Sequence, residues 1–384
     1  MCLSQNTESL TVINVVLGID LDNVDQIERS TVRLDSAAVS RPIFFRRLST
    51  SCTQRVQRPP ASPRHKTLML VLRTFLRNRG QFASRRSFRD KENCLVQSRM
   101  CSTHPKAAVC QMTATPDKEA NFSVCRDLVE RAKAAGASVV FLPEGFDYIG
   151  SSREETLDLS ESLAGETMGR HRQLARELGV WLSLGGFHER GENWGADRRI
   201  YNSHVVINTQ GEIVSIYRKG HLFDVELTGR GVSLKESAFT IPGPRLAPPV
   251  QTPVGKVGLG VCYDLRFPEL SSALQRHGAE ILTYPSAFTV ATGSAHWEVL
   301  LRARAIETQC FVFAAAQVGR HHGKRASYGH ALAVDPWGVV LADCGGAEAG
   351  VAVVEVDLQR LWDARRDMPV QQHRREPQFY CSLD

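Results

Sequence analysis

The chain has 384 residues, of which 42% are hydrophobic and 23% charged, a composition that suits one large globular domain or two smaller ones. Its formal net charge of +6 is concentrated near the N-terminus, where residues 41–89 contain many Arg and no Asp or Glu, while the rest carries both signs interspersed. This pattern argues against nucleic-acid binding by the body of the chain, and no apolar run approaches the roughly 20 residues of a membrane span.

The ten cysteines point to free thiols in a reducing compartment. They include no CxxC pair, and several lie in apolar runs, as Cys110, Cys310 and Cys344 do. The pair His321-His322 has no third ligand at metal-site spacing. We therefore expect no disulfide framework, no metal and no cofactor.

Residues 1–103 differ in character from the rest of the chain. They show weak periodicity and many Ser, Arg and Pro residues, and we expect them to form a disordered extension. The segment from Met69 has six Arg residues and no acid before Asp90, which is typical of a mitochondrial transit peptide. A start at Met69 would then give a mitochondrial form and a start at Met100 a cytosolic one, unless the resemblance is accidental. Imaging of tagged forms that begin at Met1, Met69 or Met100 tests this hypothesis, and a wholly cytosolic Met69 form contradicts it.

From residue 106 to the end, strand-like and helix-like segments alternate. The first half predicts strands at 107–112, 138–142 and 180–187, helices at 117–135 and 168–178, and a hairpin of strands 200–207 and 212–217. The second half predicts strands at 256–261, 280–284, 310–316 and 351–356, helices at 268–277 and 297–308, and a hairpin around 335–338. This order indicates an α/β domain with a mixed sheet.

Cys262 stands where a predicted strand meets a predicted helix, in the segment GKVGLGVCYDLRFPEL. A helix that starts at Pro268 would leave the sulfur and the following backbone N–H groups, including that of Tyr263, clear of the strand. Such donors can hold the oxyanion of a tetrahedral intermediate. A small core residue at the strand end would explain a single cysteine here equally well.

Glu144 and Lys219 also follow predicted strands. Glu144 lies in FLPEGF, at the sheet edge where α/β folds bind ligands, and burial there should raise its pKa so that it exchanges a proton near neutral pH. Lys219 lies in YRKGHLFD, where it could lower the pKa of the thiol and steady an oxyanion. Taken one at a time, both are equally explained as surface residues.

Together, LPEGF, YRKGHLFD and GVCYDLRFPEL resemble the signature of the nitrilase superfamily, and the resemblance extends over residues 107–357. In that superfamily a Glu acts as general base, a Lys stabilises the tetrahedral intermediate and a Cys forms a thioester. The resemblance carries these roles to Glu144, Lys219 and Cys262. A second Glu often assists, and Glu236 lies where it is expected.

The resemblance implies a carbon–nitrogen hydrolase domain over residues 106–384, folded as a four-layer αββα sandwich with mixed sheets. It implies a small-molecule amide as the substrate, with no nucleic-acid or membrane partner. It also implies a homodimer or higher homo-oligomer, for which the helix near Trp297 and the C-terminal tail are the candidate contacts.

Further segments resemble one branch of the superfamily, which hydrolyses the γ-glutamyl-type amide of deaminated glutathione; they are WLSLGGFHER, ILTYPSAF, HWEVLLRARAIETQ and RASYGHALAVDPWG. Arg266 could grip a substrate carboxylate, or else pair with Asp264 or Glu269. Phe288 and Thr292 either line the substrate pocket or pack as ordinary core residues. His296 is expected to be structural, at the start of the helix near Trp297.

Other functions remain open from the sequence. The same site would suit a general ω-amidase acting on α-ketoglutaramate, a carbamoylase or a true nitrilase, and a catalytically idle interaction protein could retain the fold. A papain-like protease would need a CGSCW-type context and a matching His segment, which the sequence lacks. An activated Cys262 should react with iodoacetamide much faster than the other nine cysteines.

Overall fold

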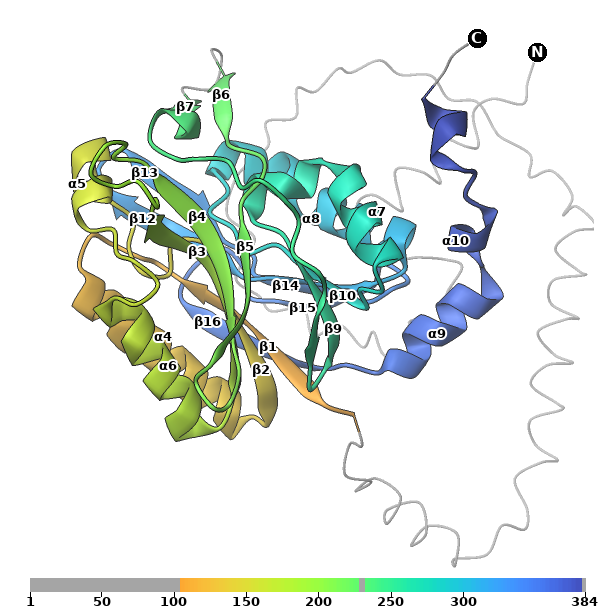
Figure 1. Cartoon of the computed structure of the whole chain (residues 1–384). Coiled ribbons are helices and arrows are strands. Elements are labelled where there is room, and N and C mark those ends of the chain that lie inside the picture. The colour runs from red at the N-terminus through yellow and green to blue at the C-terminus, as the bar shows by residue number, and fades with distance from the viewer. Residues whose placement is uncertain (1–103, 228–231, 382–384) are drawn as a thin grey trace, which may run out of the picture. The chain divides into compact units, whose positions relative to one another are not determined.

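Two mixed β-sheets pack face to face, and helices cover their outer faces (Figure 1). The computed structural model describes residues 104–227 and 232–381. The predicted N-terminal extension and targeting segment lie outside these described residues.

The first sheet has the strand order β13-β12-β1-β2-β3-β4-β5, and β16 also pairs with β1. Its central strands β12, β1, β2 and β3 are parallel, and the other pairs are antiparallel. The bounds are β1 Lys106–Met112, β2 Ala137–Leu142, β3 Trp181–Arg190, β4 Ile200–Ile207, β5 Ile213–Arg218, β12 Ala316–His322, β13 Arg325–Tyr328 and β16 Gly350–Glu355.

The second sheet has the order β15-β14-β11-β10-β9-β8, and β6 and β7 form a separate hairpin. The bounds are β6 Asp224–Leu227, β7 Val232–Lys235, β8 Val250–Thr252, β9 Gly255–Leu259, β10 Ile281–Thr283, β11 Phe311–Ala314, β14 Leu332–Val334 and β15 Val340–Asp343.

Four helices form the outer layers. Helices α4 (Lys118–Ala134) and α6 (Glu166–Leu178) cover the first sheet, and α7 (Pro268–Arg276) and α8 (Val290–Thr308) cover the second (Figure 1). Three further helices are short or lie near the C-terminus: α5 Arg153–Asp158, α9 Leu358–Asp367 and α10 Val370–His373. This layer order confirms the predicted αββα sandwich.

Strand β2 shows why the sequence folds into layers. Successive side chains of a strand point to opposite faces of the sheet, so both faces of a buried strand must be apolar. Val139 and Phe141 face the second sheet, where the ring of Phe141 stacks on that of Phe313 at 5.1 Å between centroids. Val140 and Leu142 face α4 and α6. A continuous apolar strand therefore ends, at the seam between layers, directly before Glu144.

Capping residues and glycines next to the helix ends determine where most of the helices begin and end, as predicted. The Asp117 side chain accepts a hydrogen bond from the Ala120 N–H at 3.0 Å and caps α4. Gly179 adopts a left-handed conformation, with φ at +59°, and ends α6.

Two predicted elements need correction. Helix α8 begins at Val290, where Thr289 caps it, so His296 lies inside the helix and does not open it. The predicted strand 310–316 is two strands, β11 and β12, which belong to different sheets. The chain crosses between the sheets at Ala315, inside an uninterrupted apolar run where periodicity gives no sign of a break.

Residues 104–227 and 232–381 contain no helix that is both long and apolar enough to span a membrane.

We expect the free energy of unfolding to fall as the pH drops from 6.5 to about 4. Burial lowers the pKa values of His171, His204 and His321 from 6.5 to about 4, so the folded chain keeps these rings neutral where the unfolded chain protonates them. The stabilisation is complete above the unfolded pKa and is lost as the pH approaches the folded pKa. Urea denaturation across this window measures the effect, and an unchanged unfolding free energy would contradict it.

Candidate active site

Cys262 occupies a strained turn between β9 and α7, within a short 3-10 helix, η5 (Cys262–Arg266). Its φ is +47°, in the left-handed region that non-glycine residues avoid. Two hydrogen bonds hold the turn: the Cys262 N–H donates to the Pro285 carbonyl at 3.0 Å, and the Val261 N–H donates to the Asp264 carboxylate at 3.0 Å. The predicted turn between a strand and a helix is confirmed, and Glu144 lies close enough to the thiol to influence its pKa.

Lys219, at the end of β5, lies between two carboxylates. Its Nζ is 3.0 Å from Oε1 of Glu144, which follows β2, and 3.0 Å from Oε2 of Glu236. Glu236 opens a second 3-10 helix, η4 (Glu236–Ala238). All four predicted catalytic side chains are thus brought together from four separate segments of the chain.

The charged state of Lys219 depends on the two carboxylates beside it. Lys219 is only 2% exposed, and burial alone would lower its pKa. The negative charges of Glu144 and Glu236 outweigh this effect and raise the pKa of Lys219 well above its usual value. The ammonium is therefore fixed in its charged state.

The prediction that Glu144 has a raised pKa is wrong. Burial does act to raise it, but the Lys219 charge and hydrogen bonds from Cys262, Lys219 and Asn202 outweigh burial and lower the pKa of Glu144 to about 2. Glu144 is consequently ionised at neutral pH, which is the state that a proton acceptor requires.

Lys219 acts to lower the pKa of the Cys262 thiol, as predicted, but it does not set the net direction of the shift. Burial and the negative charge of Glu144 raise the pKa of Cys262, and the Lys219 charge offsets only part of the increase. The resting site therefore holds a neutral thiol beside a carboxylate. A preformed thiolate is therefore not favoured in the free protein, and the neighbouring Glu144 carboxylate could accept the thiol proton.

Donors for an oxyanion are available on both sides of the sulfur. Among the described residues, no acceptor takes the backbone N–H of Tyr263, which directly follows the nucleophile. The Lys219 ammonium is near enough to Cys262 for their charges to interact. The arrangement can thus stabilise negative charge that develops on a carbonyl oxygen attacked by the thiol.

Asn202 and Asp264 take part in the site but were not predicted from the sequence. Asn202, in β4, donates to Glu144 at 2.9 Å and to Glu236 at 3.1 Å. Asp264 is fully buried and accepts hydrogen bonds from the Tyr217 hydroxyl at 2.9 Å and from His221 Nδ1 at 2.7 Å. It thereby ties the Cys262 turn to the Lys219 segment. The sequence offers one signal for Asn202, which is its polar side chain within the largely apolar segment IYNSHVVI.

The predicted substrate-binding residues border the Cys262 turn. The Arg266 guanidinium lies 5.4 Å from the Phe288 ring and 5.8 Å from the Tyr263 ring, and its Nη1 is 3.2 Å from His296 Nδ1. Among the residues described, no ion pair joins Arg266 to a carboxylate, so the alternative pairing with Asp264 or Glu269 does not form.

Phe288 and Thr292 have structural contacts of their own. Phe288 packs against Trp297, with 4.8 Å between ring centroids. Thr292 is hydrogen-bonded to Thr289 in the N-terminal turn of α8. Their assignment to the substrate pocket remains a prediction.

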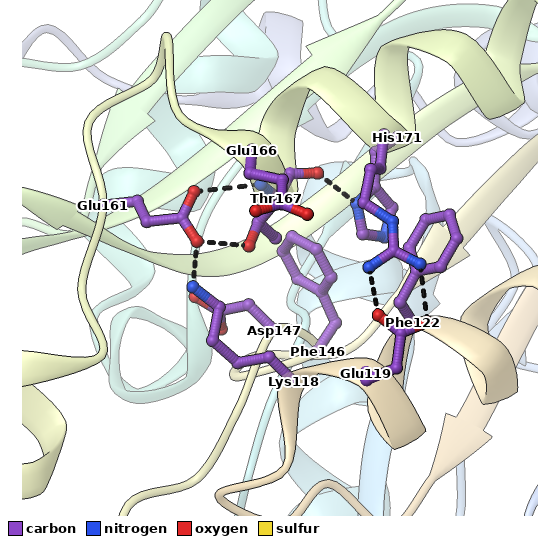
Figure 2. Close-up of a pocket in the computed structure, with 10 residues that line it drawn as sticks. Lys118, Glu119, Phe122, Phe146, Asp147, Glu161, Glu166, Thr167 and His171 are labelled. Atoms are coloured by element: carbon purple, nitrogen blue, oxygen red, sulfur yellow. Dashed lines mark hydrogen bonds and ion pairs between the residues drawn. The ribbon is translucent and has the colours of Figure 1, made fainter.

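A separate cavity of about 250 Å³ lies between α4 and the start of α6 (Figure 2). Ion pairs of Lys118 with Glu161 and of Arg170 with Glu119 line it. None of the predicted catalytic residues lines this cavity, which lies on the helical side of the first sheet and is thus separate from the predicted catalytic site. Within residues 104–227 and 232–381, no group of three or more His, Cys, Asp and Glu residues could hold a metal ion.

Comparison with known proteins gives concordant matches. Residues 106–366 match the family model described as carbon-nitrogen hydrolase. The chain is 58% identical over 288 residues to deaminated glutathione amidase of Homo sapiens, covering 75% of this chain and 87% of that protein.

Two solved structures are also similar. The crystal structure of the C. elegans NitFhit protein has 46% identity and a TM-score of 0.66, covering 72% of this chain and 66% of that one. A glutamate-to-glutamine mutant of the amidase from Nesterenkonia sp. AN1, in which acrylamide has added to the active-site cysteine, has 26% identity and a TM-score of 0.57, covering 70% of this chain and 100% of that one.

We expect Glu144→Gln to lower the pKa of the Cys262 thiol while reducing turnover by at least about 100-fold, the typical contribution of a general base. The substitution removes the negative charge that raises the thiol pKa, and it leaves Lys219 to stabilise the thiolate. The thiolate can be followed by its ultraviolet absorbance, as the difference from a matching Cys262→Ala protein. Glu212→Gln, at the β4–β5 turn, is the control. An unchanged thiol titration in folded Glu144→Gln would refute this electrostatic account.

Proposed function

The chain belongs to the carbon-nitrogen hydrolase family, and we propose that it is a cysteine amidase that hydrolyses deaminated glutathione to α-ketoglutarate and cysteinylglycine. The observation that carries the proposal is the buried cluster of Glu144, Lys219 and Glu236 beside the Cys262 thiol. The 58% identity to a deaminated glutathione amidase supports the choice of substrate.

In the first half of the reaction, the Cys262 sulfur attacks the amide carbonyl while Glu144 takes the thiol proton. Lys219 and the Tyr263 N–H hold the resulting oxyanion. As the tetrahedral intermediate collapses, the C–N bond breaks and Glu144 returns the proton to the departing amine. Cysteinylglycine leaves, and the keto acid remains attached to Cys262 as a thioester.

In the second half, Glu144 deprotonates a water molecule that attacks the thioester carbonyl. A second tetrahedral intermediate forms in the same oxyanion site, the C–S bond breaks and the thiolate recovers its proton from Glu144. The keto acid is released and the starting state is restored. Glu144 is ionised before each attack, which is the state in which it can accept a proton.

The position and charge of Arg266 support the proposal that the substrate is acidic. Its guanidinium lies 5.8 Å from the Tyr263 ring and 5.4 Å from the Phe288 ring, and no carboxylate of the described residues forms an ion pair with it. An Arg fork can bind a carboxylate through two parallel hydrogen bonds. We propose that Arg266 binds the α-keto acid end of the substrate and that Phe288 forms part of the pocket wall.

We also propose that the protein forms a homodimer through α8. Val290, Val299 and Ile306 of this helix are 53%, 69% and 45% exposed, an unusual number of apolar side chains facing solvent. Trp337 is 61% exposed on the hairpin whose Gly338 packs against Ile306. Analytical ultracentrifugation tests the proposal: the protein should sediment as a dimer or larger oligomer, and Val299→Asp should shift it to the monomer.

The substrate is tested by offering deaminated glutathione and α-ketoglutaramate to the full chain. We expect a higher kcat/KM for deaminated glutathione and no turnover by Cys262→Ala with either compound. Arg266→Met should lower kcat/KM by roughly 10–100-fold, as expected for loss of a charged hydrogen bond. A preference for α-ketoglutaramate would identify a general ω-amidase instead, and full activity of folded Cys262→Ala would overturn the mechanism.

A further inference from the structure

Asn202 contacts three of the four catalytic residues. Its side-chain Nδ2 donates to Oε1 of Glu144 at 2.9 Å and to Oε1 of Glu236 at 3.1 Å. Its backbone carbonyl accepts the N–H of Lys219 at 2.9 Å. These partners come from the end of β2, from η4 and from the end of β5, so a single residue of β4 connects them all.

We infer that Asn202 is a positioning residue of the acid–base step, because its amide bridges the two carboxylates on either side of Lys219. This inference rests on the proposed amide hydrolysis by Cys262 and Glu144.

The electrostatics of the cluster call for a neutral donor at this position. Glu144 and Glu236 share one cation, Lys219, so the buried group carries one negative charge more than it carries positive charges. Like charges at this separation repel each other. An amide offers two N–H donors without a charge of its own, and Asn202 gives one to each carboxylate. A second cationic side chain at position 202 would instead neutralise the negative charge that Glu144 needs in order to act as a base.

The same bonds select the oxygen of Glu144 that receives the proton. Oε1 is occupied by Lys219 and Asn202, whereas Oε2 accepts only the Ala287 N–H, at 2.9 Å, among the described residues. The same Ala287 N–H also lies against the Cys262 sulfur. The Ala287 N–H thus connects the surroundings of Oε2 with those of the sulfur, which favours Oε2 as the oxygen that receives the proton. Rotation about the last bond of a Glu side chain is soft, and the Asn202 donor resists it.

The side-chain oxygen of Asn202 makes no comparable contact. Its Oδ1 is buried without a hydrogen-bond partner among the residues that the structure describes, and it faces Gly186, where an added Cβ would lie 3.0 Å away. A buried acceptor without a partner is unfavourable. The amide at position 202 is thus explained by its two N–H donors and not by its oxygen.

Asn202→Leu, which removes both donors at nearly constant shape, tests the inference. We expect kcat/KM to fall by about 10–100-fold and its acidic limb to move to higher pH, because the carboxylate of Glu144 loses a hydrogen bond that favours its charged form. KM should change less than kcat. Wild-type activity, or a loss of activity with an unmoved acidic limb, would overturn the inference.

Asn208→Leu is the matched control. Asn208 directly follows the same strand, is similarly buried and donates to Glu212 at 2.7 Å, but it has no contact with the catalytic cluster. It should lower the unfolding free energy and leave the pH profile in place. If both variants shift the profile alike, Asn202 has only a general structural role.

Two further measurements separate this inference from the proposed function. Infrared difference titration against Glu144→Gln follows the Glu144 carboxyl without any substrate. Its protonated band should appear at a higher pH in Asn202→Leu than in the wild type, because one of the hydrogen bonds that lower the pKa of Glu144 is lost. In a Glu236→Gln background, Asn202→Leu should cost less activity, because the repulsion between the carboxylates is gone. An unchanged band or strictly additive losses would refute the bridging role.

Discussion

The ion cluster around Lys219 is the constraint on which the active site depends. An ammonium that is 2% exposed can remain charged only if carboxylates surround it, and Glu144 and Glu236 supply these charges at 3.0 Å each. Glu144 in turn remains ionised in its buried position because the Lys219 charge and hydrogen bonds that include one from Asn202 outweigh the effect of burial. Loss of Lys219 would therefore leave both carboxylates without their cation in the protein interior.

This arrangement explains how a buried thiol can serve as a nucleophile without being a thiolate at rest. In the proposed mechanism, the negative charge starts on Glu144 and moves to the sulfur, and then to the substrate oxygen, as the reaction proceeds. Lys219 is close enough to interact with Glu144 and with Cys262, so one fixed cation stabilises the charge at successive positions. Little reorganisation is needed, which is the main advantage of a preorganised site.

The two-sheet architecture supplies the rigidity that the cluster requires. Glu144, Lys219 and Asn202 come from strands of the first sheet or their ends, and Cys262 follows a strand of the second. The buried carboxylate of Asp264 connects the sheets by binding both the Val261 N–H and the Tyr217 hydroxyl. The core between the sheets, marked by the Phe141–Phe313 stack, fixes their distance. The left-handed turn at Cys262 can then persist because its surroundings hold it in place.

The sequence by itself indicated most strands and helices and an α/β domain, and its resemblance to the nitrilase superfamily implied the layer order and the four candidate catalytic residues. Apolar runs, helix caps and turn residues act over a few neighbours and can be read locally, and the three short motifs around Glu144, Lys219 and Cys262 are distinctive. It could not show that the run after Cys310 crosses between sheets, because both strands are equally apolar. Only the tertiary structure decided the protonation states of Glu144 and Cys262, and the parts played by Asn202 and Asp264. A pKa in a buried cluster is a balance between burial and neighbouring charges, and those neighbours come from segments far apart in the chain.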